Sequence, residues 1–123
     1  MSVRRITVLI SGGGSNLQAL IDARDHECLK VEINHVISNR AEAFGLERAR
    51  KAGIPTSILQ QDEFPRRADY DRKLAELIAV ASPDLVVLAG FMRIVGPEVL
   101  QRFAGKLINL HPSLLLLHRG TNP

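Results

Sequence analysis

The feature that most constrains the fold is a regular alternation of short apolar runs with longer amphipathic ones. The apolar runs are rich in β-branched and aliphatic residues, which favour strands. They cover residues 6–10, 31–38, 56–59, 85–90 and 106–111. Because strands that alternate with helices over short connections build a parallel sheet, the pattern predicts a Rossmann-like, doubly wound α/β fold. The continuous apolar character of residues 85–90 favours a strand buried on both faces.

Helical spacing fills the stretches between these apolar runs. The predicted helices cover residues 16–24, 41–52, about 62–81 and 97–103. Pro65 is expected in the first turn of the third helix, where a missing N–H group costs nothing. The pattern contains no internal repeat and no linker, so we expect a single domain over residues 1–123.

The composition is that of an ordinary globular protein. Basic residues exceed acidic ones by only 16 to 13 and are scattered, and aromatic residues make up 4%, which disfavours a nucleic-acid partner. No apolar run approaches the roughly 18 residues of a membrane span. The single cysteine, Cys28, has no disulfide partner in this chain, which is typical of a reducing compartment, so a cytoplasmic protein is expected. No group of His, Cys and Asp has metal-ligand spacing, so no metal is expected.

The sequence ISGGGSNL, residues 10–17, joins the first predicted strand to the first predicted helix. Three successive glycines cost conformational entropy, so they belong where the backbone bends tightly or a ligand approaches closely. In a doubly wound sheet this turn usually binds phosphate groups at the start of the helix. Gly14, Ser15 and Asn16 are therefore candidate phosphate ligands. The alternative is that Ser15 only caps the helix.

Two common nucleotide-binding patterns do not fit this turn. Leu17 stands where the dinucleotide pattern requires a third small residue, and Ser38 and Asn39 follow the second predicted strand where an acidic residue would bind a ribose. The turn contains no lysine, which disfavours a P-loop. The remaining expectation is a single phosphate on a ligand of mononucleotide size.

A second candidate site lies at the end of the last predicted strand. Asn109 and His111 are two residues apart, so on an extended strand their side chains point the same way, and Pro112 then forces the chain out of the sheet. Both are expected at the same edge of the sheet as the glycine turn. An amide beside an imidazole can stabilise an oxyanion and move a proton, which favours acyl-type transfer with direct attack by the substrate. The alternative is a hydrogen-bonded structural histidine.

Four segments together resemble the glycinamide ribonucleotide formyltransferases of purine biosynthesis. They are residues 8–23, 36–55, 84–95 and 107–115. The Asn-x-His-Pro-Ser pattern at 109–113 is typical of a wider group of formyltransferases, whereas the glycine turn with Ser-Asn singles out the ribonucleotide enzymes. The resemblance implies the formyltransferase fold. It also implies transfer of a formyl group from 10-formyltetrahydrofolate, as co-substrate, to the amine of glycinamide ribonucleotide.

The resemblance also assigns roles by position. It implies that Gly14, Ser15 and Asn16 hold the substrate phosphate. It implies that Asn109 contacts the formyl group and that His111 is the catalytic acid. The folate contacts that it implies are Arg67, Met92, Arg93, Ile94, Val95 and Asn109.

Two departures from the family pattern affect these expectations. Residues 116–119, Leu-Leu-His-Arg, replace the proline and aromatic residues of a loop that walls the site. The chain also ends at Pro123, before the family's aspartate that tunes the histidine. We therefore expect an N-terminal portion, truncated relative to the family, with impaired formyl transfer. The alternative is a non-catalytic phosphate- or nucleotide-binding module or a degenerate copy of the enzyme.

Overall fold

A computed structural model describes residues 4–26, 30–92 and 95–110 of the chain. The strands are β1 (Arg4–Ile10), β2 (Val31–Ser38), β3 (Thr56–Ile58), β4 (Leu85–Ala89) and β5 (Leu107–Leu110). The helices are α1 (Ser15–Asp25), α2 (Phe44–Lys51), α3 (Arg67–Val80) and α4 (Pro97–Arg102), with a short 3-10 helix η1 (Gln61–Glu63). The strands form one sheet in the order β3-β2-β1-β4-β5, and every neighbouring pair is parallel. The doubly wound α/β fold is confirmed, and the chain changes direction across the sheet between β1 and β4.

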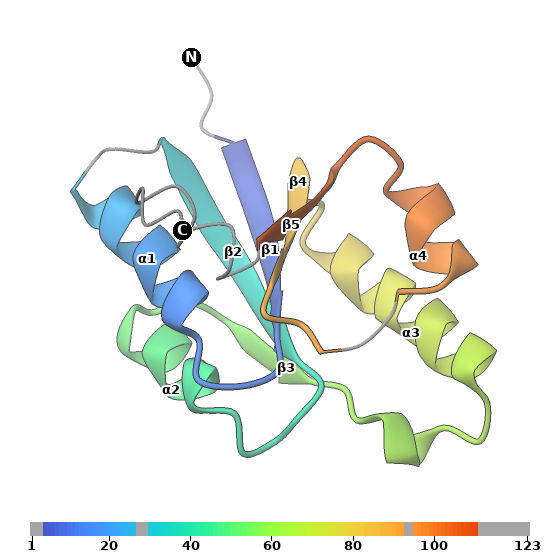
Figure 1. The fold of residues 1–123 in the computed structure, drawn as a ribbon. Helices are drawn as coiled ribbons and strands as arrows, with labels where there is room; N and C mark the ends of the chain where they lie inside the picture. The colour runs from blue at the N-terminus through green and yellow to red at the C-terminus, as the bar shows by residue number, and fades with distance from the viewer. Residues whose placement is uncertain (1–3, 27–29, 93–94, 111–123) are drawn as a thin grey trace, which may run out of the picture.

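Helices cover both faces of the sheet (Figure 1). On one face, Leu17 of α1 and Leu46 of α2 lie in a core with the alternate β1 residues Ile6, Val8 and Ile10. On the other face, α3 and α4 enclose a second core that contains Leu9. Because apolar area removed from water is the main driving force for folding, these two layers hold the sheet in place.

The strand buried most completely is β1, at the centre of the sheet. Val8, Leu9 and Ile10 have no exposed surface. The strand predicted to be buried on both faces, β4, is buried at Val86, Val87 and Ala89 but only half-buried at Leu85 and Leu88. Its neighbour β5 is a short, partly exposed strand at the edge of the sheet. The sheet is therefore less buried at β4 than at its centre, β1.

The predicted helix over 62–81 is wrong at its beginning. η1 ends at Glu63, the backbone is extended at Phe64 and Arg66, and α3 begins only at Arg67. Pro65 therefore lies before the helix. A proline disfavours helical geometry in the residue that precedes it, which agrees with the extended backbone at Phe64. The Tyr70 hydroxyl donates to the Leu59 carbonyl at 2.8 Å, and the Phe64 ring packs edge-on against Tyr70 at 5.6 Å. These contacts fix the extended segment against the second core.

The other element bounds differ from the predictions by a few residues. β2 matches the prediction, β3 and β4 end one residue earlier than predicted, and β5 begins one residue later. α2 begins at Phe44 because residues 41–42 form a turn. β2 also contains an irregularity: Ile6 pairs with Ile33 and Thr7 with His35, so Asn34 is an extra residue in the ladder.

No helix in the described ranges is long and apolar enough to cross a lipid bilayer.

Candidate functional site

The glycine turn between β1 and α1 has a backbone that only glycine adopts easily. Gly14 is the residue before the helix, and its φ is 78°, in the left-handed region. A Cβ at Gly14 would lie 2.6 Å from the Cα of Gly45 in α2, so the site has no room for a side chain. The alternative that Ser15 caps the helix is wrong: Ser15 is already helical, and no side chain makes a capping hydrogen bond.

The carbonyl oxygens of all three glycines in the turn accept hydrogen bonds. The Gly12 carbonyl accepts from the N–H of Gly45 at 3.0 Å, and the Gly14 carbonyl accepts from the N–H of Gln18 at 2.8 Å. Between them, the Gly13 carbonyl accepts from Nε of Arg48 at 2.7 Å. By contrast, the N–H groups of residues 13–15 find no acceptor among the described residues. Such free donors at the start of a helix attract an anion.

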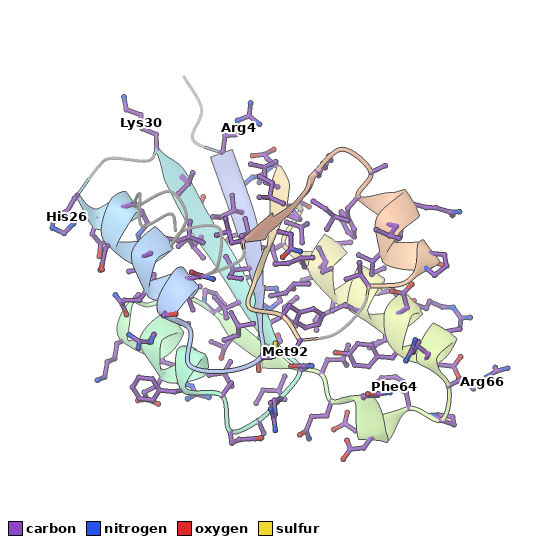
Figure 2. The ribbon with its side chains drawn as sticks, viewed as in Figure 1. Arg4, His26, Lys30, Phe64, Arg66 and Met92 are labelled. Atoms are coloured by element: carbon purple, nitrogen blue, oxygen red, sulfur yellow. The ribbon has the colours of Figure 1, made fainter. Side chains whose placement is uncertain are left out.

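A hollow of about 250 Å³ lies against this turn. Its lining residues are Ser11, Gly12, Gly13, Gly14, Ser15, Asn16, Arg40, Ala89, Gly90 and Met92. The Ser11 hydroxyl accepts from the N–H of Met92 at 2.7 Å, which ties the end of β1 to the segment after β4. Figure 2 shows Met92 at the end of the sheet opposite to Arg4, where the parallel strands finish. The hollow therefore occupies the carboxyl edge, where open α/β sheets bind their ligands.

Arg40 is a residue of this hollow that the sequence argument missed. It follows β2, its side chain is 60% exposed, and its Nε lies 3.1 Å from a Glu42 carboxylate oxygen. The sequence pattern tests the position after β2 only for an acidic residue that would bind a ribose. A cation two residues beyond the strand was the available indication of anion binding.

The structure brings together only some of the predicted site residues. Gly14, Ser15, Asn16 and Met92 share the hollow, whereas Arg67, Val95 and Asn109 do not line it. Arg67 is exposed at the start of α3, and Val95 packs against the second core. Asn109 is exposed on β5, opposite Leu88, which in turn pairs with Leu9 of β1. The predicted residues Arg93, Ile94 and His111 lie outside the described residues.

Asp71 organises the segment that follows the hollow, and the sequence argument missed it as well. Its buried carboxylate accepts from the N–H groups of Gly96 and Glu98, both at 2.7 Å, and of Val99 at 3.3 Å. Asp71 thus caps α4 from α3 and holds Gly96, the residue directly after the predicted folate segment. Its sequence position, directly after Tyr70 and three residues before Leu74, places it beside the apolar stripe of α3.

Outside the hollow, the described residues hold no candidate metal cluster and one buried histidine. No three His, Cys, Asp or Glu side chains gather within the described residues. His35 in β2 is buried, its Nε2 lies 2.7 Å from the Ser57 hydroxyl, and burial lowers its pKa. It does not line the hollow and keeps no assigned role.

Comparison with known proteins gives one consistent result. The sequence model of the formyl transferase family matches residues 4–123. The phosphoribosylglycinamide formyltransferase of Escherichia coli K12 is 54% identical over 115 residues, which are 94% of this chain and 54% of that protein. The same enzyme of Haemophilus influenzae is 43% identical over 98% of this chain and 57% of its own. The crystal structure of glycinamide ribonucleotide transformylase 1 from Symbiobacterium toebii superposes with a TM-score of 0.86 at 43% identity, over 89% of this chain and 52% of that one. The chain thus spans about half the length of these relatives.

Proposed function

This chain belongs to the formyl transferase family. We propose that it is the N-terminal half of a glycinamide ribonucleotide formyltransferase and supplies the phosphate site and the residues for formyl transfer. In that reaction a formyl group passes from 10-formyltetrahydrofolate to the amine of glycinamide ribonucleotide, a step of purine biosynthesis. The curated relatives that support this proposal are named phosphoribosylglycinamide formyltransferase or trifunctional purine biosynthetic protein. The proposed substrates are small molecules in the cytoplasm, and no metal, nucleic acid or membrane enters the proposal.

The observation that carries the proposal is the glycine turn. Its carbonyl oxygens are bonded within the protein, while the N–H groups of residues 13–15 face no described acceptor. We assign the substrate phosphate to Gly14, Ser15 and Asn16, with the Arg40 guanidinium at the rim of the same hollow. A dianionic phosphate satisfies several N–H donors at once, and such charge-assisted hydrogen bonds are the strong ones.

For the chemical step we propose direct attack of the substrate amine on the formyl carbon. The side-chain amide of Asn109 stabilises the oxygen that becomes an oxyanion. His111 takes a proton from the attacking amine and gives it to the folate nitrogen, whose bond to the formyl carbon breaks as tetrahydrofolate leaves. Arg67, Met92, Arg93, Ile94 and Val95 are the proposed folate contacts on this chain. The register that sets Asn109 level with Leu88 and Leu9 supports this assignment, since it puts the amide close to the edge where the glycine turn lies.

The test is a formyl-transfer assay with both substrates. Since the matched relatives are about twice as long, the 123-residue chain is assayed beside a chain extended by the second half of the Escherichia coli relative. The extended chain is expected to turn over and the short chain to give traces only, because the folate cleft and the oxyanion site are then open to water. An extended chain that binds both substrates and transfers nothing would identify a non-catalytic binding module instead.

The role of His111 is tested in the extended chain. His111→Ala is expected to lower the rate by roughly 100-fold or more, which is the usual loss for a general acid–base group. His26→Ala, which changes an exposed histidine at the end of α1, is the control and should leave the rate within twofold. Near-normal turnover of His111→Ala would remove that histidine from the mechanism.

A further inference from the structure

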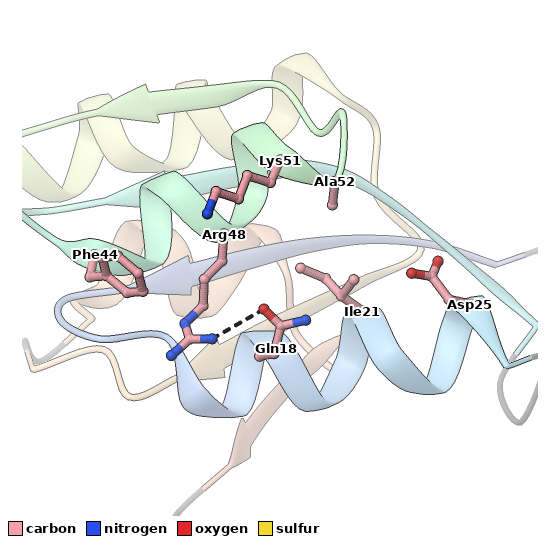
Figure 3. A pocket seen from close by; sticks show the side chains of 7 residues that line it. All are labelled: Gln18, Ile21, Asp25, Phe44, Arg48, Lys51 and Ala52. Carbon is pink, nitrogen blue, oxygen red and sulfur yellow. Dashed lines mark hydrogen bonds between the residues drawn. The ribbon is translucent and has the colours of Figure 1, made fainter.

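A second hollow, of about 290 Å³, lies between α1 and α2 on the outer side of the glycine turn (Figure 3). Its lining residues are Gln18, Ile21, Asp25, Phe44, Arg48, Lys51 and Ala52. Arg48 crosses this hollow from α2 toward α1. Its Nη1 donates to the Gln18 side-chain oxygen at 3.2 Å, while its Nε donates to the Gly13 carbonyl at 2.7 Å.

The guanidinium of Arg48 is held in place from several directions. Gln18 is itself oriented by a hydrogen bond from its Nε2 to the Asp22 carboxylate at 2.9 Å. The Phe44 ring lies 5.0 Å from the guanidinium carbon, which is the distance of a cation–π contact. Because the guanidinium is planar and presents its donors as a rigid fork, two acceptors at fixed positions determine its orientation.

This arrangement determines where the N–H groups of the turn point. In a trans peptide unit the carbonyl and the N–H of the next residue point in opposite directions. The bond from Arg48 to the Gly13 carbonyl therefore turns the Gly14 N–H away from α2. The bond from the Gly45 N–H to the Gly12 carbonyl does the same for the Gly13 N–H. Without these bonds, two adjacent glycines would be free to rotate both peptide planes.

We propose that Arg48 is a positioning residue for phosphate binding: it holds the glycine turn from behind, in the geometry that presents its N–H groups to the anion. The inference rests on the proposed function, because it takes the anion to be the phosphate of the ribonucleotide. Arg48 is not among the residues that line the phosphate hollow, so its effect passes through the Gly13 carbonyl and not through contact with the ligand.

The test compares Arg48→Met with Arg50→Met in the 123-residue chain. Arg50 is on the same helix and carries the same charge, but its exposed side chain pairs with Glu47. Titration with glycinamide ribonucleotide, followed by the amide NMR signals of residues 13–15, is expected to give a Kd about 10-fold higher for Arg48→Met. The apparent Kd rises by this factor if the turn of Arg48→Met adopts the binding geometry only about a tenth of the time. Arg50→Met should stay within twofold.

Two further measurements separate positioning from charge and from general damage. The Arg48→Met effect should persist in 0.5 M KCl, because salt screens long-range attraction but not a misplaced backbone. Binding of the nucleoside analogue without its phosphate should be unchanged, whereas a generally damaged fold would weaken both ligands. If Arg48→Met does not fold, Gln18→Met takes its place. It removes the acceptor of Nη1 together with the exposed hydrogen bond to Asp22 but leaves the bond from Arg48 Nε to the Gly13 carbonyl, and a Kd about threefold higher is expected.

The outcomes distinguish this inference from the proposed function. Turn amides of the unmodified chain that do not respond to the ribonucleotide would overturn the phosphate site, and the role of Arg48 with it. Turn amides that respond normally, with equal Kd values for the unmodified chain, Arg48→Met and Arg50→Met, would overturn the role of Arg48 alone. A loss that disappears in 0.5 M KCl would likewise reject positioning in favour of simple charge.

Discussion

Two loops at the carboxyl edge of the sheet are held in opposite ways. In the turn after β1, α2 donates hydrogen bonds to the carbonyl oxygens of Gly12 and Gly13. At Gly96 and in the first turn of α4, which follows β4 along the chain, Asp71 instead accepts from three backbone N–H groups. Both loops lead from a parallel strand into a helix, and both are fixed by a helix far away in the sequence. They differ in which half of the peptide group the protein itself uses.

The difference supports our proposal that the first loop, and not the described part of the second, binds an anion. Protein donors occupy the carbonyl groups of the first loop, so its N–H groups stay available for a ligand. In the second loop the carboxylate of Asp71 already occupies the position of an anion, and a further negative group would be repelled. A helix start beside a glycine is therefore not enough to make a phosphate site.

The largest expected effect comes from removing the internal anion of the second loop. Asp71→Ala leaves three buried or half-buried N–H groups without an acceptor, so it should lower the free energy of unfolding by about 3 kcal/mol. Urea denaturation measures the change. Asp69→Ala is the matched control on the same helix: its carboxylate pairs with Arg66 and Arg72 at the surface, and it should cost less than about 1 kcal/mol. Equal losses for the two variants would show that Asp71 does not fix the loop.

The next effect concerns the first loop. Gly14→Ala forces a side chain into the left-handed region and to within 2.6 Å of Gly45, so a loss of about 2 kcal/mol in unfolding free energy is expected, together with weaker ribonucleotide binding. Gly12→Ala is the control, because a Cβ there meets no atom within 4 Å. It should change stability by no more than about 0.5 kcal/mol. Thermal denaturation measures the stability, and NMR titration measures the binding. If the two variants have equal stability and equal affinity for the ribonucleotide, the contact between Gly14 and α2 does not constrain the turn.

The smallest effect sharpens the comparison by testing a group outside both loops. Burial lowers the pKa of His35, so below about pH 6.5 the unfolded chain takes up a proton that the folded chain does not. Stability should therefore fall as the pH falls through that range. His35→Gln, which can still bond to the Ser57 hydroxyl, should flatten this part of the profile.

The reference for this pH effect is the unmodified chain. Urea denaturation of both proteins between pH 7 and pH 5.5 measures the change in slope. A slope that survives in His35→Gln would assign the pH dependence to other groups.

The sequence predicted the sheet well because its signal is local. Apolar runs such as residues 6–10 and 31–38 coincide with β1 and β2 to within a few residues, and their alternation with helices determines the parallel topology. The helix starting near residue 62 was wrong because periodicity continued through Pro65, while the extended backbone there depends on contacts with Tyr70. The apolar pattern of residues 31–38 gives no sign that Asn34 is an extra residue in the ladder between β1 and β2.

The candidate site was only half predictable for a related reason. The residues of the glycine turn could be recognised because glycine has a direct backbone consequence, and Gly14 has the positive φ that this implies. Arg48 and Asp71 look like ordinary charged positions on helices, and their roles appear only when α2 meets the turn and α3 meets α4. Contacts between segments far apart in sequence leave no periodic pattern to detect.

The close approach of Gly14 and Gly45 also has an evolutionary consequence. A Cβ at Gly45 would lie 2.5 Å from the Cδ1 of Ile10 and 3.2 Å from the Cα of Gly14, so each glycine excludes a side chain at the other. Moving the two helices apart to admit one would stretch the hydrogen bond from Gly45 to the Gly12 carbonyl. The 2.5 Å contact at Gly45 is with the end of a side chain that can move, whereas a Cβ at Gly14 would meet backbone at 2.6 Å, so we expect descendants of this chain to keep glycine more strictly at position 14 than at position 45.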